Sequence, residues 1–201
     1  MAYISDRVVH DADAHIMEPP NWLRDHADPG IRDRIERPGY ANELIQTGDG
    51  DHGGDQARID AVFERLAQRH RTEEFLADED VEVMNRKNFA ATGSFLAEDR
   101  PRVLDFIGVQ SQLLFNTFHN SRLYQWEHQP DLDLAYGTAR AHNRGMIEFC
   151  SVDPRLLPTC YVPLADFERA DAMAGEAIGM GAAALLVASG CPRGHSPSHI
   201  A

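Results

Sequence analysis

The sequence has few cysteines and no long apolar run. Its 201 residues include three cysteines, Cys150, Cys160 and Cys191, and no two of them form a CxxC pair. An odd number of cysteines without paired spacing is typical of free thiols in a reducing compartment. No apolar run approaches the roughly 18 residues of a membrane span. The N-terminal MAYISDRVV lacks the basic and apolar regions of a secretory signal. We therefore expect a cytoplasmic protein.

Basic residues are also scarce. Lysine and arginine together number 19 against 32 aspartates and glutamates, which gives a formal net charge of -13. A surface that binds phosphate groups must be basic, so this balance argues against nucleic acids and anionic membranes as partners. Net acidity favours solubility but names no substrate. An enzyme that acts on a small molecule and a purely structural domain both stay open.

Two families of catalytic motif are missing. No G-x-S-x-G sequence is present, and none of the cysteines has an evident electropositive setting that would activate its thiol. The glycines of GDGDHGG do not lie between a strand and a helix, as a phosphate-binding loop requires. The sequence thus gives little support to a nucleophilic triad or to a nucleotide site.

Apolar segments alternate with helical patterns along most of the chain. Four segments have the composition of buried strands, near residues 8–15, 111–118, 156–164 and 182–189. Between them the spacing predicts helices, of which the clearest cover 96–107, 131–150 and 167–178. The segment 21–38 predicts two short helical turns, and Ile59, Val62, Phe63 and Leu66 form one amphipathic helical face. Strands separated by helices predict an α/β fold with a parallel sheet of about four βα units.

The first strand carries many side chains that can bind metals. The stretch VVHDADAHIMEPP places Asp11, Asp13 and His15 at alternate positions, so these three are expected to share one face. Asp13 and His15 would lie at the carboxyl end of the strand, with Glu18 on the following loop. A carboxylate and an imidazole two residues apart can hold one divalent ion; zinc fits best, and manganese or iron would also serve. Alternatively, an aspartate caps the turn and His15 is a core histidine.

DADAHIMEPPNWL resembles the first-strand motif of the amidohydrolase-related proteins, in the branch that includes aminocarboxymuconate-semialdehyde decarboxylase and the γ-resorcylate-type decarboxylases. That superfamily has a metal-dependent (β/α)8 barrel and usually opens with an H-x-H pair. Asp13 stands where the first histidine would, as an acidic residue does in some decarboxylases, and His15 matches the second. The resemblance therefore implies Asp13, His15 and Glu18 as metal ligands.

Later segments resemble the same family in the same order. VLDFIGVQSQLLFNT is similar to its second strand, AHNRGMIEFCSVDPRLLPTCYVPLADFERA to its long helix and third strand, and AIGMGAAALLVAS to its fourth. The family's further histidine after the fifth strand and aspartate after the eighth have no counterpart. Because a full barrel takes about 250 residues, we interpret 1–201 as a single incomplete domain, the N-terminal part of such a barrel. Residues 40–95 would be an insertion between strands 1 and 2, and 190–201 a terminal loop.

Other polar residues have weaker claims. Asn116, Thr117 and His119 follow the second strand, and we predict that Asn116 and His119 contact the substrate. His142, Asn143 and Arg144 are expected to form a polar helix face, and His195 and His199 to lie in the terminal loop.

Two functional hypotheses follow, with a third less favoured. The first is a metal-dependent decarboxylase or hydrolase that acts on a small carboxylated or cyclic metabolite. The second is a catalytically incompetent fragment or an interaction module, because four parallel strands leave two edges and one apolar face uncovered. A homo-oligomer would cover them. The third is a complete small α/β binding domain.

Overall fold

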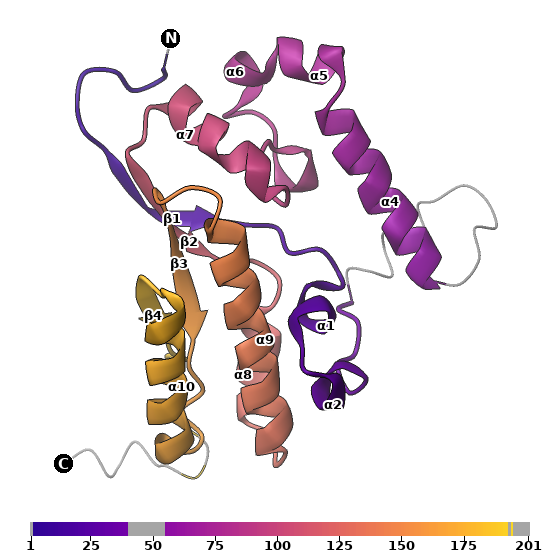
Figure 1. The fold of residues 1–201 in the computed structure, drawn as a ribbon, viewed down its shortest axis with the longest axis vertical. Helices are drawn as coiled ribbons and strands as arrows, with labels where there is room; N and C mark the ends of the chain where they lie inside the picture. The colour runs from indigo at the N-terminus through magenta and orange to yellow at the C-terminus, as the bar shows by residue number, and fades with distance from the viewer. Residues whose placement is uncertain (1, 40–54, 193, 195–201) are drawn as a thin grey trace.

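The computed structural model describes residues 2–39, 55–192 and 194. In this part of the chain four parallel strands form one sheet in the order β1-β2-β3-β4, which confirms the predicted α/β class (Figure 1). Each strand pairs with the next one along the chain, as consecutive βα units do. The strands are β1 (His10–His15), β2 (Ser111–Phe115), β3 (Leu156–Tyr161) and β4 (Ala184–Leu186).

Helices follow or separate the strands. Between β1 and β2 the described elements are α1 (Trp22–His26), α2 (Pro29–Arg32), α4 (Asp55–His70), α5 (Glu73–Ala77), α6 (Glu79–Glu82), η1 (Asn88–Ala90), η2 (Ala97–Asp99) and α7 (Arg100–Ile107). Between β2 and β3 they are α8 (Asn120–Glu127) and α9 (Leu132–Cys150), and α10 (Phe167–Met180) precedes β4. The helices predicted near 21–38, 59–66, 96–107, 131–150 and 167–178 are all present. None of the described helices combines the length and apolar character that crossing a membrane requires.

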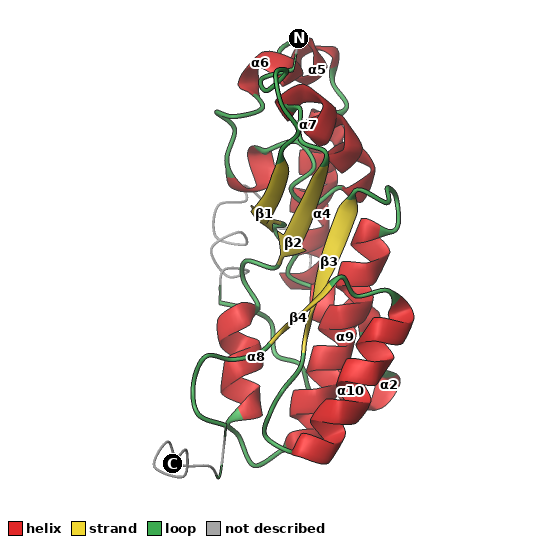
Figure 2. Ribbon diagram, turned by 90° about the vertical axis from the view of Figure 1, so that its left-hand side faces the viewer, coloured by secondary structure: helices red, strands yellow, loops and turns green. Residues whose placement is uncertain are grey.

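The long helices cover one face of the sheet. Figure 2 shows α9 and α10 on the same side of the strands, with α8 beyond their carboxyl ends. Along β2, Gln112 and Leu114 are buried while Ser111, Leu113 and Phe115 are only half-buried. The helix-covered face contributes to an apolar core whose members include Ala14, Leu104, Leu114, Met146 and Phe149. We call the opposite side, which carries Leu113 and Phe115, the open face.

Local capping explains why α9 and α10 begin where the sequence predicts. The Asp131 side chain accepts a hydrogen bond from the backbone N–H of Leu134, and Asp166 accepts one from Arg169. Such N-caps satisfy donors that a helix otherwise leaves unpaired. Gly181 ends α10 with a φ of 107°, a conformation that glycine adopts without strain.

Several predicted details are wrong. The strands end at Phe115, Tyr161 and Leu186 rather than at 118, 164 and 189. The helix α8 follows β2 in a segment for which the sequence predicts no helix. His142 and Asn143 are fully buried rather than on a polar helix face, because α9 turns them inward, where Asn143 bonds to the backbone of Tyr161 through both amide atoms. Residues 40–54, His195 and His199 lie outside the described residues. All three cysteines are free thiols, as expected.

Glycines let the short helices pack closely on α9, and this generates a stability prediction. A Cβ at Gly145 would lie 2.6 Å from the buried indole of Trp22. We expect Gly145→Ala to lower the free energy of unfolding by about 1–3 kcal/mol through overpacking, as measured by urea denaturation.

Gly175 provides the matched control, since a Cβ there meets nothing within 4 Å inside α10. Gly175→Ala is expected to raise stability by about 0.5–1 kcal/mol, the usual helix gain of alanine over glycine. Equal effects of the two substitutions would contradict the close packing of α1 on α9.

Candidate functional site

The carboxyl end of β1 contains an irregularity that determines where its side chains point. Asp11 pairs with Gln112 of β2, whereas Ala14 pairs with Leu114. The chain therefore advances three residues along β1 over a stretch where it advances two along β2. This is the pattern of a β-bulge, in which an extra residue breaks the alternation of faces. Residues before and after the bulge therefore do not follow a single alternating series.

The bulge overturns one expectation. Asp11 does not share a face with Asp13 and His15, because its carboxylate accepts a hydrogen bond from Gln112 Nε2 (3.1 Å) on the helix-covered side. Its other oxygen accepts the backbone N–H of Asp13 at 3.0 Å. Asp11 is thus a structural residue, and it lies on the side opposite to the one predicted.

Asp13 and His15 come together on the open face. Asp13 Oδ1 lies 3.5 Å from His15 Nε2, and the two side chains are 92% and 40% exposed. The imidazole packs beside Phe115, with ring centroids 5.8 Å apart. An exposed polar contact of this kind contributes little to folding stability, so its geometry matters mainly for what the two side chains could bind.

The other ring nitrogen of His15 fixes its tautomer. Nδ1 lies 2.9 Å from the backbone carbonyl oxygen of Asn116. Because a carbonyl oxygen only accepts hydrogen bonds, Nδ1 carries the proton in this contact, and in the neutral ring Nε2 keeps a free lone pair. Metal-binding histidines commonly donate their second N–H to a backbone carbonyl in this way.

The spacing of the pair fits two ligands of one ion. With zinc–ligand bonds of about 2.0–2.2 Å, two ligands of a tetrahedral zinc ion lie about 3.3–3.6 Å apart. The observed 3.5 Å between Asp13 Oδ1 and His15 Nε2 falls in this range and exceeds an ordinary hydrogen bond. Within the described parts of the chain, no three His, Cys, Asp or Glu side chains gather to form a metal site. The pair by itself could therefore offer a divalent ion no more than two side-chain ligands.

Glu18 holds a loop and is not exposed beside the pair. The side chain is fully buried, and its carboxylate accepts the backbone N–H groups of Thr117 (2.9 Å), Phe118 (3.0 Å) and His119 (3.2 Å). Burial raises the pKa of this carboxyl above its usual 4.5, and the backbone hydrogen bonds oppose the rise. Glu18 joins the end of β1 to the segment that leads into α8; its predicted role as a ligand stays a prediction.

The residues after β2 lie mostly inside the protein. Asn116 and His119 are fully buried, so neither side chain meets solvent, and substrate contact by them stays a prediction. Burial lowers the pKa of His119 to about 3, assisted by the positive charge of Arg122. Thr117 donates through its hydroxyl to the backbone oxygen of Ile16 at 2.7 Å, which further ties this segment to β1.

A cleft lies close to the pair at the carboxyl ends of β2, β3 and β4. It has a volume of about 330 Å³, and its lining combines aromatic, aliphatic and small polar side chains: Phe115, Asn120, Ser121, Tyr124, Tyr161, Leu186, Val187, Ala188 and Ser189. Phe115 also contacts His15, so the cleft and the pair share a wall. The hydroxyl of Tyr161 donates to Glu127 at 2.5 Å. Burial raises the pKa of Tyr161, and the Glu127 carboxylate adds to the rise. Tyr124, Tyr161 and Glu127 belong to no catalytic motif in the sequence, so their place in or beside the cleft was not predicted.

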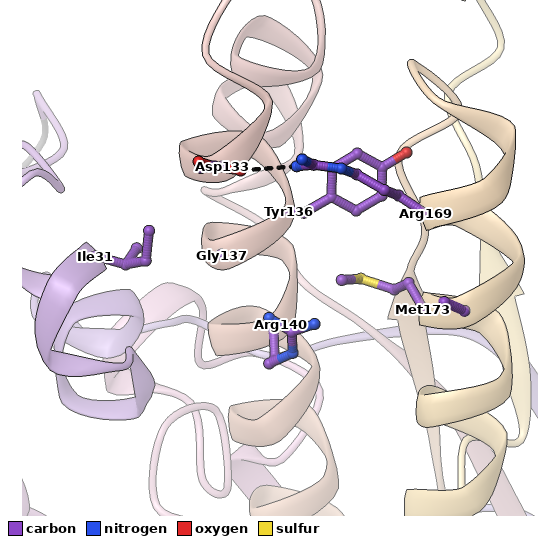
Figure 3. Close-up of a pocket in the computed structure, with 8 residues that line it drawn as sticks. Ile31, Asp133, Tyr136, Gly137, Arg140, Arg169 and Met173 are labelled. Atoms are coloured by element: carbon purple, nitrogen blue, oxygen red, sulfur yellow. Dashed lines mark hydrogen bonds and ion pairs between the residues drawn. The ribbon is translucent and has the colours of Figure 1, made fainter.

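A second cleft, of about 350 Å³, lies on the helical layer between α2, α9 and α10 (Figure 3). Its two arginines are already paired, Arg169 with Asp133 at 2.8 Å and Arg140 with Glu176 at 2.8 Å. Neither Asp13 nor His15 lines it. The chemistry of the β1 end therefore points to the first cleft.

Fold and site together define an α/β protein of consecutive βα units with a candidate metal-binding pair at the carboxyl end of its first strand. No family model matches the sequence, and no curated protein matches it. Among solved structures, the fold is similar to that of an amidohydrolase from Mycobacterium avium subsp. paratuberculosis K-10, with a TM-score of 0.54 and 19% sequence identity. The similarity covers 92% of this chain and 50% of that chain, so this chain spans about half the length of the amidohydrolase.

The buried Glu18 carboxylate generates a prediction about pH. Its pKa is raised in the folded chain, so its contribution to stability is complete below the unfolded pKa near 4.5 and falls as pH rises through the folded pKa. Glu18→Gln replaces an acceptor oxygen with a donor facing backbone N–H groups. It should lower the free energy of unfolding by about 1–3 kcal/mol and remove this part of the pH slope.

Urea denaturation from acid to neutral pH measures both effects. Glu148→Gln is the control, because that side chain is 77% exposed and surface changes usually stay within about 0.5 kcal/mol. A Glu18→Gln protein with wild-type stability and pH slope would show that the carboxylate does not hold the loop.

Proposed function

We propose that this chain contributes the first two ligands of a metal centre in a metal-dependent protein of the amidohydrolase superfamily. The observation that carries the proposal is the His15 side chain, whose Nδ1 faces the Asn116 carbonyl while Nε2 lies 3.5 Å from Asp13. The similarity to a solved amidohydrolase supports the fold assignment. Zinc is the metal that best fits a carboxylate and an imidazole at this spacing, and manganese or iron would also serve.

The metal, when bound, would polarise a substrate carbonyl or carboxylate, or lower the pKa of a bound water. The residues of this chain would prepare that chemistry. Asn116 orients the His15 ring through its backbone carbonyl, and Asp13 supplies negative charge beside Nε2. Glu18 holds the loop that carries this carbonyl in place.

The cleft beside Phe115 gives the proposal a substrate class. Its aromatic and aliphatic walls suit the ring of a small cyclic metabolite, and Asn120, Ser121 and Ser189 offer hydrogen bonds to polar substituents. A carboxylate on such a ring would point toward the metal pair. We infer decarboxylation or hydrolysis of a small cyclic or carboxylated metabolite; the resemblance of DADAHIMEPP to the aminocarboxymuconate-semialdehyde decarboxylase branch favours decarboxylation.

Metal titration tests the proposal. We expect isothermal titration calorimetry with zinc to show one site per chain, and His15→Ala and Asp13→Ala each to weaken binding at least about 10-fold, since each removes a ligand.

His10→Ala is the matched control, because His10 is an exposed histidine of the same strand whose ring bonds to Ser111. It should bind zinc as the unmodified chain does. Equal zinc binding by the unmodified chain and the His15→Ala variant would contradict the assignment.

A second candidate function is an interaction module. At the β4 edge of the sheet Leu185 and Val187 are 40% and 46% exposed, and β1 and β4 each have one neighbouring strand among the described strands. Apolar side chains next to unpaired strand edges favour association. We infer that a second copy of the chain would cover the β4 edge.

Size-exclusion chromatography with light scattering measures this association. We expect a species of twice the chain mass or more, and Val187→Glu should shift it toward the monomer. Val81→Glu, at a residue of α6 that is 70% exposed, serves as the control. A monomer at all concentrations would rule the module out.

A further inference from the structure

The Asp11 side chain stabilises the bulge in β1. Asp11 Oδ1 accepts a hydrogen bond from the backbone N–H of Asp13 at 3.0 Å. This N–H lies in the irregular part of the β1–β2 pairing, and the carboxylate provides its acceptor. This contact fixes the backbone of Asp13 and with it the direction of the Asp13 side chain. An aspartate that binds the N–H two residues later is a common way to stabilise a local turn.

Asp11 is itself fixed by a buried chain of side chains. Its Oδ2 accepts from Gln112 Nε2 at 3.1 Å, and Gln112 Oε1 accepts from Arg100 Nε at 2.8 Å. Gln112 is 2% exposed and Arg100 is 7% exposed. Buried polar networks of this kind specify one arrangement when each member has its partners.

The chain of contacts returns to the other member of the pair. Arg100 Nη1 donates to the backbone carbonyl oxygens of His15 and Gly93, each at 3.2 Å. Gly93 has a φ of 67°, and a Cβ there would lie 2.8 Å from the Arg100 Cα, so the approach requires glycine. The backbones of Asp13 and His15 are thus held by one connected network.

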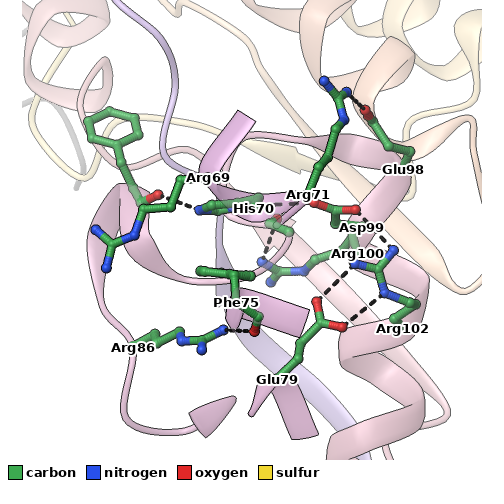
Figure 4. Close-up of polar contacts among 12 residues, drawn as sticks. Arg69, His70, Arg71, Phe75, Glu79, Arg86, Glu98, Asp99, Arg100 and Arg102 are labelled. Atoms are coloured by element: carbon green, nitrogen blue, oxygen red, sulfur yellow. Dashed lines mark hydrogen bonds and ion pairs between the residues drawn. The ribbon is translucent and has the colours of Figure 1, made fainter. Parts of the chain in front are cut away.

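Charge balance keeps the network together. Burial lowers the pKa of Arg100 to about 10, and the negative charge of Asp11 opposes that shift. The guanidinium is still charged at neutral pH, and losing Asp11 would leave it without its nearby negative partner. Figure 4 shows Arg100 next to Arg102, which binds Glu79 of α6 at 2.9 Å and Asp99 at 3.0 Å. The first turn of α7 is therefore anchored on both sides.

We propose that Asp11 is a positioning residue: through the β1 bulge, and supported by Gln112 and Arg100, it sets the orientation of Asp13 and His15 toward one metal ion. The inference rests on the proposed metal-binding function. It adds a residue that touches neither metal nor substrate but determines whether the two ligands meet.

The test combines two readouts on Asp11→Ala and Asp11→Asn. Long-range 1H–15N correlation spectra of the metal-free protein, at about pH 8 where an ordinary imidazole is neutral, report the His15 tautomer. The unmodified chain should show Nδ1–H, and Asp11→Ala a mixture of tautomers. Zinc affinity from calorimetry should fall about 10- to 100-fold in Asp11→Ala, the usual cost of losing a supporting partner of a metal ligand. Asp11→Asn, which keeps one acceptor oxygen, should lie between.

Ser111→Ala is the matched control, because it removes the 2.7 Å contact between His10 and Ser111, another side-chain bond between β1 and β2. It should change neither readout. If Asp11→Ala fails to fold, Asp11→Asn decides by the same measurements. Variants that lose thermal stability but keep the tautomer and the affinity would overturn the positioning role. If the unmodified chain binds no zinc, the metal proposal fails, and the tautomer spectra still decide whether Asp11 orients His15.

Discussion

One extra residue in β1 decides what the sheet presents at its open face. The step from Asp11 to Ala14 spans three residues against two in β2, which turns Asp11 toward the helices and leaves Asp13 and His15 on the open side. Asp11 in that position meets Gln112 and, through it, Arg100. The same irregularity thus separates a structural carboxylate from one available for binding, although the two differ by only two positions in the sequence.

The parts of the fold that depend on local chemistry were predictable. The helices α9 and α10 have aspartate N-caps, α10 ends at a left-handed glycine, and the apolar strands alternate with them. The proximity of Asp13 and His15 also followed from simple alternation, because the two residues are two positions apart and their side chains lie on the same face. Cross-strand order follows from βα connectivity, so the α/β class and the parallel sheet required no knowledge of distant contacts.

The parts that depend on distant contacts were not predictable. His119 is the N-cap residue of α8, and its side chain makes no capping hydrogen bond. The backbone N–H groups that lead into the helix instead donate to the Glu18 carboxylate, about a hundred residues earlier in the sequence. The sequence of α8, NSRLYQWE, contains no signal that Glu18 is the partner of these N–H groups. The bulge is likewise connected to Gln112 and Arg100, and their local sequence does not show that these polar side chains are buried. Burial of Glu18 and His142 follows from how α8 and α9 pack, which alternation and spacing do not encode.

The central claim is that Asp13 and His15 are two ligands of one metal ion, and zinc-soaked crystals test it most directly. Anomalous scattering should show one zinc peak about 2.0–2.2 Å from both His15 Nε2 and a carboxylate oxygen of Asp13, with Nδ1 still facing the Asn116 carbonyl. Zinc peaks only at other places on the chain, with the contact between Asp13 Oδ1 and His15 Nε2 unchanged, would contradict this claim.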